Sequence, residues 1–119
     1  MVYQREGVYK VVRKSLLNDT PKNLIRKYRE VLKREGIPVE KIILFGSYAK
    51  KKAKPWSDVD LCVVSKLFGK DSYDEMVRLK KLTSEIDPMI EPHPYHPNDL
   101  ADPYDPLAYE ILHTGVAVS

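Results

Sequence analysis

The sequence predicts a single α/β (α+β) domain over residues 1–119, in which a small mixed β-sheet is flanked by helices on one side. Residues 21–35 carry apolar side chains at helical spacing, and residues 41–45 and 58–64 have the composition and alternation of strands. The order helix, strand, turn, strand, helix, strand, helix is typical of a sheet covered by helices. A chain of 119 residues can build one hydrophobic core, so we expect no second domain.

The first elements are predicted from start and stop signals. A short helix is expected within residues 1–19, where apolar side chains recur at helical spacing. Pro21 and Gly36 mark a typical helix start and end, so the next helix covers residues 21–35. Residues 41–45 form a short run rich in strand-forming apolar residues, which predicts a buried strand.

The second half of the chain is predicted to continue the same alternation. Residues 58–64 form the second strand, and a helix follows with Ser72 as its N-cap, ending near residue 84. Residues 88–95 contain three prolines, which lack the N–H that a central strand needs, so any strand here is an edge strand. A final helix is expected between Asp105 and Gly115.

The composition excludes several classes of protein. Hydrophobic residues make up 43% of the chain and charged residues 31%, as in ordinary globular proteins and unlike disordered ones. No apolar run approaches the roughly 18 residues of a membrane span, and the N-terminus lacks the apolar stretch of a secretory signal. The one cysteine, Cys62, cannot form an internal disulfide. We therefore expect a cytoplasmic protein without a membrane partner.

Charge is divided unevenly along the chain. The net charge of +3 is the sum of +10 over residues 1–54 and −7 over residues 55–119. A basic half and an acidic half in one small domain indicate a site that needs both signs, for phosphates and for metal ions. The alternative is that helices near the N-terminus simply have solvated basic faces.

Asp58 and Asp60 are candidate metal ligands. At positions i and i+2 of one strand they lie on the same face, about 7 Å apart at the backbone. Their like charges repel unless a cation lies between them, and aspartate is a poor strand residue. An exposed sheet face, with Asp58 still in the preceding loop, is the alternative.

Gly46 and Ser47 form a candidate phosphate cradle ahead of this pair. Glycine permits a tight turn at the end of the first strand, and Ser47 offers a hydroxyl and an N–H at the start of a short basic segment. The segment lacks the Gly-Lys-Ser/Thr end of a P-loop. Gly-Ser stands at the end of one predicted strand and Asp-x-Asp at the start of the next. The two motifs at this spacing are more specific evidence for a site than either motif alone.

Residues 46–61 closely resemble the GS-x10-DxD signature of the minimal nucleotidyltransferases, small members of the DNA polymerase β superfamily. The resemblance implies the nucleotidyltransferase fold and transfer of a nucleoside monophosphate, usually AMP from ATP, to an acceptor hydroxyl with two Mg²⁺ ions. It also implies that Gly46 and Ser47, together with Lys50 and Lys51, bind the triphosphate. The chain departs from the family at these two lysines, where relatives often carry Arg-Gly or Lys-Gly.

The family also uses a third carboxylate on a following strand. The best match is Glu91, where many relatives have aspartate, and the resemblance therefore implies that Asp58, Asp60 and Glu91 are the catalytic metal ligands. Asp87 is the competing candidate, although it precedes a proline and is expected in a turn. His93 shares the face of Glu91 and could contact nucleotide or metal, or be a structural histidine.

The resemblance also implies which proteins this chain binds. Minimal nucleotidyltransferases typically work with a helical HEPN-domain toxin, acting as antitoxins that adenylylate one of its tyrosines, and a homodimer is also expected. The alternatives are a catalytically weak or inactive nucleotide-binding subunit, a DxD glycosyltransferase, which needs a larger domain, and a nucleic-acid-binding protein. The nucleic-acid-binding protein is less favoured, although Tyr48 and Trp56 flank a cluster of lysines at positions 50, 51, 52 and 54.

Overall fold

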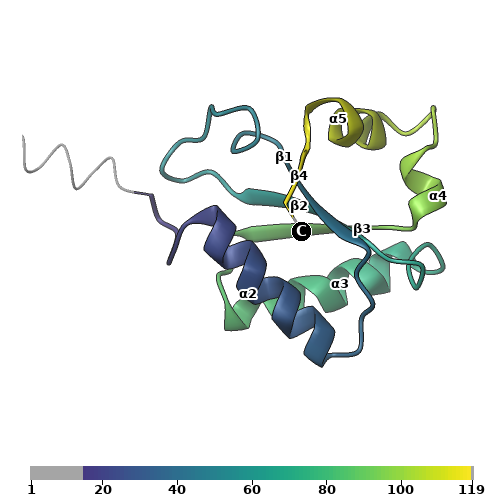
Figure 1. Ribbon diagram of the computed structural model, residues 1–119, viewed down its shortest axis with the longest axis horizontal. Coiled ribbons are helices and arrows are strands. Elements are labelled where there is room, and N and C mark those ends of the chain that lie inside the picture. Colours follow the sequence, from purple (N-terminus) through teal and green to yellow (C-terminus); the bar gives the residue numbers. More distant parts are fainter. Residues whose placement is uncertain (1–14, 119) are drawn as a thin grey trace, which may run out of the picture.

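The computed structural model describes residues 15–118, which form a four-stranded mixed sheet with helices packed against it (Figure 1). β1 (Lys41–Phe45) pairs antiparallel with β2 (Val59–Val64), and β3 (Ile90–Tyr95) pairs parallel with β2. β4 (Val116–Ala117) pairs antiparallel with β1, so the sheet order is β3-β2-β1-β4. The predicted α/β class and mixed sheet are confirmed: β1 has the predicted bounds, β2 begins one residue later than predicted, and β3 is an edge strand.

α2 (Pro21–Arg34) has the predicted position because its capping and its apolar stripe agree. The Thr20 hydroxyl accepts a hydrogen bond from the Asn23 amide at 3.3 Å, which satisfies one free N–H of the first turn. The apolar stripe is buried and consists of Leu24, Ile25, Tyr28, Val31 and Leu32. The Tyr28 hydroxyl donates to the backbone oxygen of Leu79 at 2.8 Å, so the ring is both packed and hydrogen-bonded.

α3 (Ser72–Leu82) has a different N-cap from the one predicted. The Asp71 carboxylate accepts a hydrogen bond from the amide three residues on, at 3.1 Å, and Ser72 is the first helical residue. The Glu75 carboxylate accepts hydrogen bonds from the amides of residues 69–71 at 3.0 to 3.2 Å. The prediction of Ser72 as the cap was wrong because an aspartate one position earlier is an equally good cap acceptor.

Helices lie on both faces of the sheet (Figure 1). α2 and α3 cover one face, where the strands contribute Ile42, Val59, Leu61, Val63 and Ile90 to the core. On the other face, two short helices, α4 (Pro97–Leu100) and α5 (Pro106–Thr114), pack on strand residues Ile43, Phe45, Cys62 and Val64. The prediction of helices on one side therefore holds only for the long helices, because β2 is apolar on both faces and needs cover on both.

Several short elements were not predicted. They are the 3₁₀ turn η1 (Thr83–Glu85), α4 and β4, which are too short to carry a periodic pattern. The final helix was predicted between its Asp105 cap and Gly115, and α5 confirms it. The helix expected within residues 1–19 lies largely outside the described residues. Among residues 15–118, no helix combines the length and the apolar character needed to cross a bilayer.

Candidate active site

The Gly46–Ser47 pair leads from β1 into a single helical turn. The Lys50 amide donates to the Gly46 oxygen at 3.1 Å, and the Lys52 amide donates to the Ser47 oxygen at 2.9 Å. Within the described part of the chain, the amides of residues 47–49 and the Ser47 hydroxyl have no hydrogen-bond partner in the protein. Free amides at the start of a helical turn, next to a free hydroxyl, form an environment that favours an anion.

Gly46 brings this turn into direct contact with the carboxylate of Asp60 on β2. Its φ of 74° lies in the left-handed region that glycine adopts without strain. A Cβ atom at this position would overlap Oδ2 of Asp60, because Phe45 and Asp60 are register partners between β1 and β2. Only glycine allows the backbone of the candidate cradle to approach the Asp60 carboxylate this closely.

Lys51 occupies the position where the resemblance leads us to expect glycine. Its φ is 58°, the one positive φ of a non-glycine residue among residues 15–118. The turn therefore keeps the left-handed backbone of a glycine but carries a lysine there. A non-glycine residue in this region costs about 1 kcal/mol, so the departure from the family pattern affects stability more than it affects the path of the chain.

We expect Lys51→Gly to stabilise the fold by up to about 1 kcal/mol, because the strain of the left-handed backbone is removed. Urea unfolding measures the change. Lys52→Gly is the matched control, since Lys52 lies outside the left-handed region and glycine there lowers stability by about 0.4–1 kcal/mol through the entropy of the unfolded chain. A lower free energy of unfolding for both variants would contradict the assignment of strain to Lys51.

Asp60 and Glu91 lie opposite each other in the sheet. They are register partners on the parallel strands β2 and β3, so their side chains leave the same face from backbones about 4.8 Å apart. Asp87 lies elsewhere: it is 1% exposed, and its carboxylate accepts hydrogen bonds from the amides of Asn18 and Met89, at 2.7 and 2.8 Å. Asp87 therefore closes the turn before β3, and Glu91 is the acid that faces Asp60.

Asp58 lies immediately before β2 and is exposed to solvent. The amide of the next residue, Val59, donates to the oxygen of Met89 at 2.9 Å, which holds the start of β2 against the segment that leads into β3. Asp58 is thus at the same end of the sheet as Asp60 and Glu91, but on a loop rather than within the predicted strand.

Two basic side chains accompany the strand carboxylates. Lys80 Nζ of α3 lies 3.7 Å from Glu91 Oε2 and donates to the backbone oxygens of Pro88 and Ile90 at 2.9 and 2.8 Å. His93 Nε2 lies 3.9 Å from Asp60 Oδ1. Lys80 was not predicted from the sequence, because one lysine among several on a helix carries no local signal of a long-range contact.

The carboxylates of Asp58, Asp60 and Glu91 are of the right chemical type to bind a divalent cation, although their side chains do not converge on one point. Carboxylate oxygens are the ligands that Mg²⁺ prefers, and Asp58, Asp60 and Glu91 supply them at one end of the sheet. Within residues 15–118, no group of three His, Cys, Asp or Glu side chains is close enough to form a ready ligand cluster. Glu91 instead faces Lys80 in a long, partly exposed ion pair, and Asp60 faces His93 at 3.9 Å; neither contact is strong enough to hold its carboxylate away from a cation.

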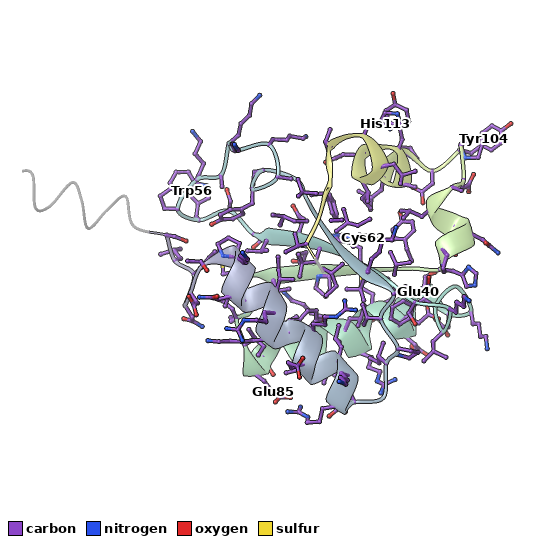
Figure 2. The ribbon with its side chains drawn as sticks, viewed as in Figure 1. Glu40, Trp56, Cys62, Glu85, Tyr104 and His113 are labelled. Carbon is purple, nitrogen blue, oxygen red and sulfur yellow. The ribbon has the colours of Figure 1, made fainter. Side chains whose placement is uncertain are left out.

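A cavity of about 470 Å³ begins at His93 and follows the second half of β3 to Gly69 and Asp99, toward the end of β2 that is far from Asp58. Its lining includes the apolar parts of Tyr73, Met76 and Leu107 and three aspartates, but no lysine or arginine. The turn beside Asp60 therefore carries lysines, whereas the cavity that starts at His93 is lined by acidic side chains. The view with side chains shows Tyr104 and His113 at the end of the molecule away from Trp56, which lies in the β1–β2 loop (Figure 2).

The family model described as "Nucleotidyltransferase domain" matches residues 25–92, more than half of the chain. The chain belongs to this nucleotidyltransferase family. The match runs from α2 into β3 and so includes the Gly46–Ser47 turn, both aspartates and Glu91. The resemblance of residues 46–61 to the minimal nucleotidyltransferases is thereby confirmed.

A curated relative supports the assignment of this chain to the nucleotidyltransferase family. The chain is 34% identical over 64 residues to "Putative protein adenylyltransferase MJ1217" of Methanocaldococcus jannaschii, a match over 54% of this chain and 57% of the relative. The chain thus spans little more than half the length of this curated relative.

Two solved structures share the nucleotidyltransferase fold. The crystal structure of a "putative nucleotidyltransferase" from Sulfolobus solfataricus superposes with a TM-score of 0.59 at 16% identity, over 98% of this chain and 89% of that one. A "toxin-antitoxin with AMP-PNP" superposes with a TM-score of 0.50 at 21% identity, over 82% and 72% of the two chains. At these identities the likeness shows the fold.

Proposed function

We propose that this nucleotidyltransferase transfers AMP from ATP to a hydroxyl group of a partner protein, with two Mg²⁺ ions held by Asp58, Asp60 and Glu91. The observation that carries the proposal is the contact between the Gly46 turn and Asp60, which in turn lies opposite Glu91. A binding turn for phosphates thus adjoins a pair of carboxylates that binds cations. Bound Mg²⁺ would supply electrostatic stabilisation of the attacking and leaving oxygens.

Each residue of the site has a separate task in this proposal. The amides after Gly46 and the Ser47 hydroxyl bind the β- and γ-phosphates, and Lys50 and Lys51 neutralise charge on the departing pyrophosphate. Lys50 first has to leave Glu110, whose Oε2 lies 3.6 Å from its Nζ in a half-exposed pair. Glu91 accepts the proton of the acceptor hydroxyl on a carboxylate oxygen.

The acceptor approaches from the β3 side in this proposal. The cavity beside His93 has an acidic and partly apolar lining, which suits an uncharged aromatic hydroxyl better than a phosphodiester. We propose a tyrosine of a HEPN-domain toxin as the acceptor, which gives the chain an antitoxin role. The similarity to a protein described as a putative protein adenylyltransferase, and to a chain of a toxin–antitoxin structure, supports a protein acceptor of this kind.

A nucleotide-binding subunit without turnover is the second candidate function. It is favoured by the side chains of Asp60 and Glu91, which face His93 and Lys80 rather than a common point. ATP labelled at the α-phosphate separates the two functions when it is added with Mg²⁺ to this chain and the protein encoded beside it. The proposal predicts label on the partner and release of pyrophosphate, whereas nucleotide binding without either result establishes the second candidate.

Ser47→Ala is expected to weaken ATP binding about tenfold, because one charge-assisted hydrogen bond to a phosphate is lost. Calorimetric titration of ATP in the presence of Mg²⁺ measures the change in Kd. Ser84→Ala is a matched control, since Ser84 lies in the η1 turn and its hydroxyl donates to the Lys81 oxygen. Equal ATP affinity in the wild type and Ser47→Ala would argue against the cradle.

A further inference from the structure

The tip of the loop between β1 and β2 is used by neither the fold nor the proposed transfer reaction. Lys52, Lys54 and Trp56 lie there, and we call these three residues the loop tip. Trp56 is 67% exposed, and both lysines are exposed. Within the described residues, neither lysine has a carboxylate at ion-pair distance. Figure 2 shows Trp56 at the outer end of the loop.

The loop holds Trp56 in this exposed position by specific hydrogen bonds. The Ser57 amide donates to the Lys54 oxygen at 3.0 Å, and the Lys54 amide donates to the Ser57 hydroxyl at 2.8 Å. The Leu16 amide donates to the Pro55 oxygen at 2.9 Å, which attaches the segment before α2 to the same turn. An exposed tryptophan forgoes a large hydrophobic gain, so a turn that fixes it in solvent indicates a planar binding partner.

We propose that the loop tip binds single-stranded nucleic acid, with a base stacked on Trp56 and the phosphates beside it paired with Lys52 and Lys54. Aromatic rings flanked by cations are the common device for binding single strands, because every base has a face that stacks. Lysine is depleted from protein–protein interfaces, which makes an acidic protein the less favoured occupant. The start of α2, with exposed Lys22 and Arg26, lies at the same end of the molecule (Figure 1).

The inference goes beyond the proposed transfer reaction and does not depend on it. Stacking on Trp56 and pairing with Lys52 and Lys54 require neither ATP nor a metal ion. Strand binding can therefore be measured in EDTA, and Asp58→Asn is expected to leave it intact. A failure to detect AMP transfer would contradict the proposed function alone, and a failure to detect strand binding would contradict this inference alone.

Trp56 is the one tryptophan of the chain, so its fluorescence reports directly on the loop tip. An oligouridylate of about 12 nucleotides, within the usual site size of single-strand binders, is expected to quench this fluorescence in low salt. Replacing both lysines in Lys52→Gln/Lys54→Gln should weaken binding about tenfold and make the salt dependence of log K shallower by about 1.4. Trp56→Ala, followed by the anisotropy of a labelled strand, should weaken it about tenfold.

The double variant Lys66→Gln/Lys70→Gln is the matched control. It removes the same charge beyond the opposite end of β2, about 20 Å away, and should bind the strand as the wild type does. Equal weakening in this control would show a net-charge effect and overturn the proposal. So would the absence of quenching, or equally tight binding of polyglutamate, which would indicate an acidic protein partner.

Discussion

Replacing Asp60 by asparagine is expected to reduce Mg²⁺-dependent AMP transfer by at least about a thousandfold. Asp60 contacts the Gly46 turn on one side and faces Glu91 on the other, so in the proposed function it adjoins both the phosphate cradle and the metal site. Loss of one negatively charged metal ligand removes several kcal/mol of transition-state stabilisation, and about 4 kcal/mol corresponds to that factor. Initial rates with α-labelled ATP measure it.

The fold of this variant should be retained, because Asp60 is part-exposed and its pairing with His93 is long. Binding of Mn²⁺, followed by electron paramagnetic resonance, should fall in parallel with activity, which separates loss of the ion site from loss of the protein. Asp74→Asn, an exposed carboxylate on α3, is the control and should change neither quantity. Near wild-type turnover in Asp60→Asn would rule out the metal role.

Gly46→Ala is expected to lower the free energy of unfolding by at least about 2 kcal/mol and to abolish ATP binding. The left-handed φ of 74° costs a non-glycine residue about 1 kcal/mol, and the new methyl group also overlaps the Asp60 carboxylate. Either the turn or Asp60 has to move, and each movement separates the proposed phosphate cradle from the proposed metal ligand.

Gly36→Ala separates the two effects of this substitution. Gly36 also has a positive φ, 78°, but a Cβ atom there meets nothing within 4 Å. It should therefore lower stability by about 1 kcal/mol through the backbone alone and leave ATP binding unchanged. Urea unfolding and calorimetric ATP titration are compared for both glycine variants. If Gly46→Ala behaved like Gly36→Ala in both measurements, the contact between Gly46 and Asp60 would have no functional consequence.

The elements that sequence analysis predicted well are those specified by neighbouring residues. The stripe of α2, the five apolar residues of β1 and the capped final helix each carry their pattern within one segment. The Gly-Ser to Asp-x-Asp spacing belongs to the same class, because β1 and β2 are consecutive antiparallel strands joined by one loop. The exact helix cap, the short elements α4 and β4, and the second helical layer lacked such a pattern.

The chain by itself determined its class, its main helices and strands, and the family to which residues 25–92 belong. The tertiary structure decided which distant residue meets Asp60. The parallel register of β2 and β3 puts Glu91 opposite Asp60. The Asp87 carboxylate instead accepts a hydrogen bond within the turn before β3, and Lys80 of α3 pairs with Glu91. The physical reason is that strand register and helix packing depend on how the whole core fills, which no local run of residues specifies.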